Sequence, residues 1–254
     1  MLLAIDAGNT NTVFAVYKGD TLSASWRCQT AAARTADEYA AFIDGLFRHG
    51  GIEWKSIKHV IVSSVVPEAN FHLRRFTQKY LNTDPLFVDN TMAGIEVVLD
   101  KPDEVGADRL VNSVAVVAHY QYPAIVVDFG TATTFDVIDA KGRYCGGAIA
   151  PGVNLSLDAL HRAAAKLPRV NVGQPNSVIG TNTTQAMRSG IYWGYVGMIE
   201  GILSRMESEM GVKPFVIATG GLAPLFSRST PQIQTVDEDL TLKGLLLIHQ
   251  RNKV

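Results

Sequence analysis

The stretch Asp6-Ala7-Gly8-Asn9-Thr10-Asn11-Thr12 recurs in altered form as Asp128-Phe129-Gly130-Thr131-Ala132-Thr133-Thr134. Each copy follows a short apolar run and leads into a β-rich segment, a Lys-Gly turn and another strand candidate. The matched pairs are Asp6 and Asp128, Gly8 and Gly130, Thr12 and Thr134, and Val16 and Ile138. A repeat of about half the chain predicts two related domains, each opening with a three-strand antiparallel meander. The alternative is a chance similarity between two hairpins.

The composition fits an α/β protein with a sizeable core. The chain has 254 residues, of which 47% are hydrophobic, and its net charge is −1. This charge balance argues against a dedicated nucleic-acid or anionic-membrane partner. Cys28 and Cys145 are too few for a disulfide framework. No apolar run approaches the roughly 18–20 residues of a membrane span, and the first run is too short for a secretion signal. We therefore expect a cytoplasmic protein.

Helical patterns follow each meander. We expect one domain over residues 1–118 and a second over residues 119–254. The segment Ala36–His49 has an apolar side and is followed by two glycines, which predicts an amphipathic helix that ends there. Further helices are predicted from Pro67, within Lys101–Tyr120, and over Val153–Ala165, Thr181–Glu209 and Leu240–Gln250.

The two hairpins are candidate anion and cation sites. The chain has neither a GxxxxGK[ST] nor a GxGxxG pattern, so the two common glycine-rich phosphate loops are not indicated. A tight turn of Gly, Asn and Thr can nevertheless direct N–H groups and hydroxyls at a phosphate. Asp6 and Asp128 end the preceding strands, and their carboxylates suit a hard cation, Mg²⁺ or K⁺. The alternative is that each Asp only caps its turn.

Three further motifs contain small or charged residues where a ligand can approach. In Gly106-Ala107-Asp108-Arg109, Arg109 can bind a carboxylate through two bonds and Asp108 can accept a hydroxyl proton. The alternative is a solvated or capping Asp-Arg pair. Thr219-Gly220-Gly221 joins a strand to a helix, and its glycines admit a ligand or serve only the turn geometry. Gly146–Gly152 either lines a substrate pocket or allows close packing.

Together these motifs resemble the type III pantothenate kinase family. The segments that carry the resemblance run in order along essentially the whole chain: Asp6–Thr10 (DAGNT), Gly106–Arg109 (GADR), Asp128–Thr134 (DFGTATT), Gly146–Gly152 (GGAIAPG), Ile179–Gly190 (IGTNTTQAMRSG) and Thr219–Ala223 (TGGLA). DAGNT and TGG are typical of the superfamily of acetate and sugar kinases, Hsp70 and actin. GADR together with DFGTATT is specific to this kinase type.

The resemblance implies an α/β fold of two ribonuclease-H-like domains in tandem, as in the actin-like ATPases. It implies ATP-dependent phosphorylation of pantothenate to 4′-phosphopantothenate, the first step of coenzyme A synthesis. Its further implications are Mg²⁺ and a monovalent cation (K⁺ or NH₄⁺) as cofactors, and a homodimer whose subunits complete each other's pantothenate pocket. The rival hypotheses are another small-molecule kinase of the superfamily and a non-catalytic regulator.

The resemblance also assigns roles to residues. Asp108 would be the catalytic base, and Asp128 would hold the monovalent cation. Asp6 would lie near Mg²⁺, directly or through water. The implied ATP contacts are Asp6, Ala7, Gly8, Asn9, Thr10, Asn11, Thr12, Val13 and Thr131, to which the glycine pair adds Gly220 and Gly221. The implied pantothenate contacts are Gly106, Ala107, Asp108, Arg109 and Thr183, with Leu99 where many members of the family have Tyr.

Overall fold

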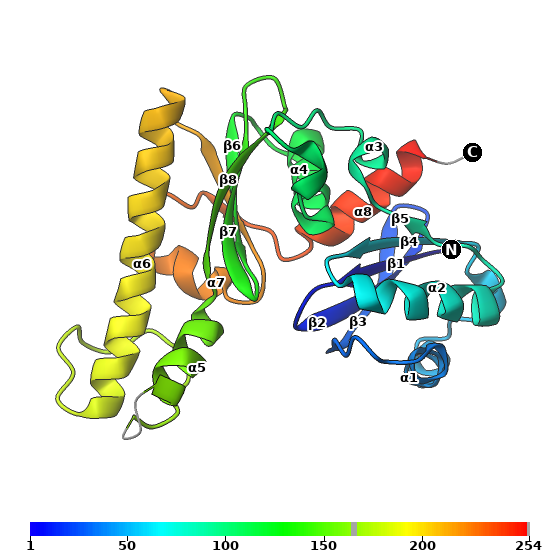
Figure 1. Cartoon of the computed structure of the whole chain (residues 1–254), viewed down its shortest axis with the longest axis horizontal. Helices are drawn as coiled ribbons and strands as arrows, with labels where there is room; N and C mark the ends of the chain where they lie inside the picture. Colours follow the sequence, from blue (N-terminus) through cyan, green and yellow to red (C-terminus); the bar gives the residue numbers. More distant parts are fainter. Residues whose placement is uncertain (164–166, 253–254) are drawn as a thin grey trace. The chain divides into compact units, whose positions relative to one another are not determined.

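The computed structural model describes residues 1–163 and 167–252 (Figure 1). The chain forms two compact units, one of Met1–His119 with the segment from Leu240 onward, and one of Tyr120–Asp239. Each unit contains a five-stranded sheet, so the predicted α/β class with two tandem domains of one kind is confirmed. Among the described residues, no helix combines the length and apolarity needed to cross a bilayer.

In unit 1 the sheet has the strand order β3-β2-β1-β4-β5. The first three strands are an antiparallel meander, as predicted, and β4 and β5 run parallel to β1. The bounds are β1 Leu2–Ala7, β2 Asn11–Lys18, β3 Thr21–Gln29, β4 His59–Ser64 and β5 Leu86–Phe87.

Helices cover both faces of this sheet (Figure 1). Leu3, Ile5 and Phe14 face α1 and α2, whereas Leu2 and Ala4 face α4 and α8, because neighbouring strand residues point to opposite faces. The bounds are α1 Ala36–His49, α2 Pro67–Leu81, α3 Asn90–Ala93, α4 Ala107–His119 and α8 Leu240–Arg251, with 3₁₀ turns at Trp54–Ser56 and Pro102–Glu104. The first helix has the predicted bounds, and a capping box of Thr35 and Glu38 begins it.

Unit 2 repeats this topology with the order β10-β9-β6-β7-β8. Its meander is β6-β7-β8, and β9 and β10 run parallel to β6. The Lys-Gly turn of each meander contains a glycine with positive φ, +61° at Gly19 and +74° at Gly142. The bounds are β6 Ala124–Phe129, β7 Ala132–Ile138, β8 Tyr144–Pro151, β9 Phe215–Thr219 and β10 Thr235–Val236.

The helices of unit 2 pack on one face of its sheet, against Ile125, Val127 and Phe135 (Figure 1). The bounds are α5 Val153–Ala163, α6 Thr183–Met210 and α7 Ala223–Phe226, with a 3₁₀ turn at Ser227–Ser229. Asn182 begins α6 by accepting the Gln185 N–H at 3.0 Å, so this helix starts two residues later than predicted. The predicted end of the preceding helix, at residue 165, lies outside the described residues.

The last helix differs from the predicted division at residues 118 and 119. That division assigned α8 to the second domain, but α8 packs in unit 1 against α4. The approach is close because α8 has Gly244 at the contact, where an added Cβ would lie 2.1 Å from the Val111 carbonyl oxygen. Helix periodicity predicted this helix but contained no information on which sheet it covers.

Candidate active site

A row of four residues crosses the unit 1 sheet where β1 and β4 end. Asp6 on β1 pairs with Val13 on β2 and with Ser63 on β4, and Val13 pairs in turn with Arg27 on β3. Directly paired residues project from the same face of a sheet. That face also carries Leu2 and Ala4, so the Asp6 carboxyl lies on the side that α4 and α8 cover.

Asp6 supplies the carboxyl group of this row, and its pKa is shifted. Its pKa is raised to about 7, first because the carboxyl is buried and second because of the negative charge of Asp108. The Ser63 hydroxyl and the Arg27 guanidinium act in the opposite direction and lower this pKa. The structure thus brings together Asp6 and Asp108, two of the predicted site residues.

The surroundings of Asp6 fit a divalent cation. Ser63 is fully buried, and its hydroxyl makes no hydrogen bond of normal geometry with the described residues. A carboxylate beside a second oxygen is the donor chemistry that Mg²⁺ prefers, and a bound cation would offset the cost of burying the charged Asp6. Within residues 1–163 and 167–252 no three His, Cys, Asp or Glu side chains cluster for a metal, so protein ligands would make only part of the Mg²⁺ shell.

The hairpin after Asp6 has a buried base and an exposed tip. Ala7 and Thr12 are fully buried, so they support the turn and do not face solvent. The tip is closed by the Gly8 N–H, which donates to the Asn11 carbonyl at 3.0 Å. The exposed residues at the tip are Asn9, Thr10 and Asn11.

The first turn of α4 holds Asp108. The Arg109 N–H donates to Asp108 Oδ1 at 2.8 Å, and the N–H groups of Arg109 and Leu110 donate to the Gly106 carbonyl at 3.1 and 3.2 Å. A helix N-terminus stabilises a negative charge. A Cβ at Gly106 would lie 2.6 Å from Asp108 Oδ1, so a side chain at this position would displace the Asp108 carboxylate. Asp108 and Arg109 are half-buried, as is Leu99 in the segment that precedes this turn.

Unit 2 has an equivalent row with different chemistry. Asp128 on β6 pairs with Thr134 on β7 and Thr219 on β9, and Thr134 pairs with Ile149 on β8. Gly220 has φ +87°, and a Cβ there would lie 2.8 Å from Asp128 Oδ1, so the strand-to-helix turn approaches this carboxylate closely. The predicted residues Asp128 and Gly220 are therefore neighbours, and Gly221 beside them is exposed.

A buried carboxylate orients the Thr134 hydroxyl. Thr134 Oγ1 donates to Asp136 Oδ2 at 2.8 Å, and the Tyr144 hydroxyl donates to Asp136 Oδ1 at 2.9 Å. A hydroxyl has one hydrogen, and Thr134 Oγ1 donates its hydrogen to Asp136. Its lone pairs therefore remain to accept a bond or bind a cation on the Asp128 face. Two hydroxyl oxygens, from Thr134 and the buried Thr219, thus flank the Asp128 position.

The second hairpin is one residue shorter than the first, which corrects the repeat alignment. Asp6 pairs with Val13, whereas Asp128 pairs with Thr134. Thr134 therefore corresponds to Val13 and not to Thr12, as the sequence match indicated. The exposed Thr131 lies in this shorter turn, where the Gly130 N–H donates to the Ala132 carbonyl at 3.0 Å.

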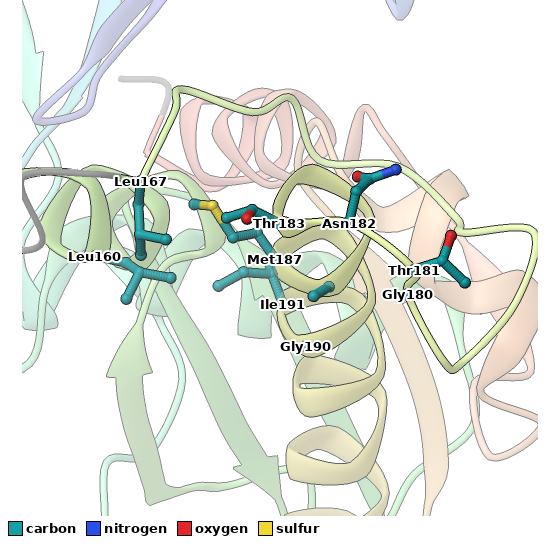
Figure 2. Close-up of a pocket in the computed structure, with 10 residues that line it drawn as sticks. Leu160, Leu167, Gly180, Thr181, Asn182, Thr183, Met187, Gly190 and Ile191 are labelled. Carbon is teal, nitrogen blue, oxygen red and sulfur yellow. The ribbon is translucent and has the colours of Figure 1, made fainter.

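Thr183 lies in a different part of unit 2. It is the first residue of α6 and lines a depression of about 590 Å³, into which Leu160, Leu167 and Met187 also project (Figure 2). The depression is mostly apolar at α5 and hydroxyl-rich at Thr181 and Thr183. Thr183 therefore belongs to the first turn of α6, whereas Asp128 lies on β6.

Comparison with known proteins decides the family. The model of the family described as type III pantothenate kinase matches residues 2–205. The chain belongs to the type III pantothenate kinase family. It is 56% identical over 254 residues to the type III pantothenate kinase of Paramagnetospirillum magneticum, covering 99% of this chain and 98% of that protein. It is 57% identical over 255 residues to the type III pantothenate kinase of Rhodospirillum rubrum, covering 100% of this chain and 99% of that protein.

As a type III pantothenate kinase, the chain is a phosphotransferase that phosphorylates pantothenate, the first step of coenzyme A biosynthesis. The resemblance stated from the motifs is confirmed. The fold likeness extends to the inorganic polyphosphate/ATP-glucomannokinase of Arthrobacter, with a TM-score of 0.52, 13% identity and 99% of both chains covered. At that identity the likeness concerns the fold alone.

Sequence reasoning on this pantothenate kinase missed Ser63 and Arg27, and it quoted Thr219 only as part of a turn motif. Ser63 is the penultimate residue of β4 and Thr219 is the last residue of β9, and each strand runs parallel to the strand of an aspartate. Polar residues at such strand ends were a usable signal, because parallel strands place their ends at one edge of a sheet. Arg27 had no such signal, because its place opposite Val13 follows from strand register alone.

Proposed function

We propose that phosphoryl transfer from ATP to pantothenate takes place at the cluster of Asp6 and Asp108. The single observation that carries this proposal is the proximity of the two carboxyl groups: the charge of Asp108 helps to raise the pKa of Asp6 to about 7. Two carboxyl groups held close together attract a cation. They also suit a reaction in which one carboxylate accepts a proton.

The hairpin Asp6–Val13 is proposed to hold the ATP phosphates. Its exposed tip of Asn9, Thr10 and Asn11 offers amide and hydroxyl groups, and its buried base at Ala7 and Thr12 supports that tip. Asp6, assisted by the Ser63 oxygen, would bind Mg²⁺ directly or through water. A bound Mg²⁺ would neutralise part of the charge of the phosphates.

Asp108 is proposed as the base. Its carboxylate would accept the proton of the pantothenate hydroxyl as the hydroxyl oxygen bonds to the γ-phosphorus and ADP leaves. The first turn of α4 supports this position of Asp108, because the Arg109 N–H donates to Asp108 Oδ1 at 2.8 Å. Arg109 would bind the pantothenate carboxylate, with Gly106, Ala107, Leu99 and Thr183 as further contacts.

Unit 2 is proposed to supply the monovalent cation site and further ATP contacts. The oxygens of Asp128, Thr134 and Thr219 form a donor set that suits K⁺ or NH₄⁺. Thr131 and the glycines Gly220 and Gly221 would contact ATP, since the positive φ of Gly220 brings backbone close to Asp128.

A homodimer and a cytoplasmic location complete the proposal. Several large apolar side chains of unit 2 are exposed, including Leu155 at 53%, Val178 at 64% and Ile179 at 81%. Such side chains are typical of an interface. Light scattering after size exclusion tests the dimer, and cell fractionation tests the location.

The substitution Asp108→Asn tests the proposed chemistry. We expect turnover to fall by at least about 100-fold, because a base is lost, while Mg-ATP binding and folding persist. The matched control is Asp100→Asn, an exposed carboxylate eight residues earlier, which should leave turnover unchanged. Near-normal turnover in the Asp108 variant would remove this residue from the mechanism.

A further inference from the structure

Thr30, which follows β3, holds the first hairpin from a distance of about twenty residues along the chain. Its hydroxyl donates to the Gly8 carbonyl at 2.7 Å, and its N–H donates to the Thr10 carbonyl at 2.9 Å. Its hydroxyl also lies 2.8 Å from the Thr12 hydroxyl. Thr30 thus bonds to three positions of the hairpin: Gly8 just before the tip, Thr10 within the tip, and Thr12 at the base.

The direction of these bonds follows from the hydrogens available. The Thr30 hydroxyl has one hydrogen and donates it to Gly8, so it must accept from Thr12. The result is a chain of hydrogen bonds from Thr12 to Thr30 to Gly8. Hydrogen bonds in such a chain strengthen one another. Thr12 is fully buried, so water does not compete for its hydroxyl.

The contact orients an amide group of the tip. A trans peptide unit is planar, and its C=O and N–H point in opposite directions. Because the Gly8 carbonyl points at Thr30, the N–H of the same peptide unit, that of Asn9, points away from Thr30. Thr12 lies on the face of the sheet that carries Phe14 and α1, opposite to the face of Asp6. The bonds to Thr30 therefore hold the hairpin from the sheet face opposite to that of Asp6.

The second hairpin provides an internal comparison. Gly152 occupies the place of Thr30: its N–H donates to the Thr131 carbonyl at 3.1 Å, as the Thr30 N–H does to Thr10. Gly152 has no hydroxyl. Thr133, which corresponds to Thr12, is fully buried and its hydroxyl has no hydrogen-bond partner among the described residues. The hydroxyl chain is thus specific to the first hairpin and is not required by the topology.

We propose that Thr30 is a positioning residue for ATP, which fixes the Gly8–Thr10 tip so that the Asn9 N–H faces the phosphates. This inference rests on the proposed function, in which the hairpin Asp6–Val13 binds the phosphates. Thr30 acts through Gly8 and Thr10 and does not itself touch ATP. Its loss should therefore affect ATP and leave pantothenate binding unchanged.

The test compares Thr30→Val, which keeps the shape and loses the hydroxyl, with Thr30→Ser, which keeps the hydroxyl. We expect Thr30→Val to raise the Kd and the KM for Mg-ATP about tenfold, the usual scale for lost hydrogen bonds, with the KM for pantothenate unchanged. Thr30→Ser should restore the ATP values to within about twofold. The matched control is Thr21→Val at the far end of β3, where the side chain is exposed. Calorimetry with Mg-ATP and steady-state kinetics give the values.

Two results would overturn the inference. One is an unchanged Kd for Mg-ATP in Thr30→Val, and the other is an equal loss for ATP and pantothenate, which would indicate general damage. If Thr30→Val fails to fold, Thr12→Val removes one hydrogen bond of the chain and should raise the Kd for Mg-ATP about threefold. An unchanged Kd in Thr12→Val would also contradict the inference.

Thr10→Val separates the two proposals. If it binds Mg-ATP normally, the hairpin is not the phosphate site and both proposals fail. If it weakens binding while Thr30→Val does not, only the role of Thr30 is lost.

Discussion

The two hairpins share one topology but are held in different ways. In unit 1 the residue after the meander is Thr30, whose hydroxyl bonds to the Gly8 carbonyl. In unit 2 it is Gly152, which has no side chain and lies so close to the turn that an added Cβ would be 2.2 Å from the Thr131 carbonyl oxygen. The first hairpin is fixed by hydrogen bonds, and the second by close backbone packing.

The two four-residue rows that contain Asp6 and Asp128 also differ in their side chains. Asp6 lies in a row with Arg27, Val13 and Ser63, whereas Asp128 lies in a row with Ile149, Thr134 and Thr219. The first row contains a cationic side chain, and the second contains more oxygen donors. The comparison teaches that a duplicated fold keeps the position of a carboxylate while the polar side chains on the neighbouring strands change.

The largest expected effect concerns the packing of the second hairpin. Gly152→Ala should lower the free energy of unfolding by about 4 kcal/mol or prevent folding, because backbone must move to admit the methyl group. Gly173→Ala is the matched control, since nothing lies within 4 Å of its added Cβ. Urea denaturation measures both. A loss below about 1 kcal/mol for Gly152→Ala would show that the turn yields easily.

The second prediction tests whether the proposed dependence of turnover on a monovalent cation belongs to Asp128 and not to Asp6. Replacing K⁺ and NH₄⁺ by Na⁺ at equal ionic strength should reduce turnover about tenfold or more, the scale of one lost charge-assisted contact. Asp128→Ala should lose most activity together with this dependence, whereas the residual activity of Asp6→Asn should keep it. Equal rates of the unsubstituted enzyme in both salts would leave Asp128 as a structural residue.

The third prediction uses the pKa of Asp6. An acid whose pKa rises on folding, here to about 7 from 3.8, binds its proton more tightly in the folded state. Its contribution to stability is therefore complete below about pH 4 and is lost as the pH rises towards 7. Between pH 5 and pH 8, without Mg²⁺ or nucleotide, Asp6→Asn should gain about 1–2 kcal/mol over the unsubstituted chain, a value reduced for solvent screening.

Denaturation at the two pH values measures this gain. Asp100→Asn, at an exposed position of the same unit, is the control. If the stability of Asp6→Asn relative to the unsubstituted chain is the same at both pH values, the Asp6 carboxyl is not perturbed. Saturating Mg²⁺ should reduce the difference, since a bound cation favours the charged form.

The smallest expected effect is a difference in stability between valine variants of the two buried threonines, Thr12 and Thr133. Thr12→Val breaks a hydrogen bond and should cost about 1 kcal/mol of stability. Thr133→Val removes a buried hydroxyl without a described partner and should be neutral or stabilising by up to about 1 kcal/mol. The opposite ranking, measured by thermal and urea denaturation, would contradict the difference drawn between the hairpins.

Much of the fold could be predicted from the sequence, because it follows from local patterns. The duplicated meander was visible in the two hairpin motifs, and α1 was predicted with its observed bounds from apolar spacing and flanking glycines. The position of α8 could not be predicted in this way. Its place against Val111 depends on a contact between distant segments, and Gly244 is an inconspicuous residue in a helical pattern.

The candidate site could be predicted only where its residues form contiguous motifs. Asp6, Asp108 and Asp128 each belong to one. Ser63 reaches the site through strand pairing and Thr30 through hydrogen bonds to the hairpin, and a single-residue difference in hairpin length changes which residue faces the carboxylate. Thr134 was matched with Thr12 for this reason, although pairing places it opposite Asp128.

The return of α8 to unit 1 has a consequence for how the chain folds. The Thr241 hydroxyl donates to Asn112 Oδ1 at 2.8 Å across a separation of 129 residues, a contact whose closure in an unfolded chain costs much entropy. Unit 2 fills this interval, and within it the Tyr120 hydroxyl donates to Asp237 Oδ2 at 2.7 Å, so its two ends are adjacent. Once unit 2 has folded, the end of α4 and the start of α8 are therefore held close together. We therefore expect the addition of α8 to unit 1 to become easier once the inserted unit 2 has folded, because the segment to be closed is then effectively short.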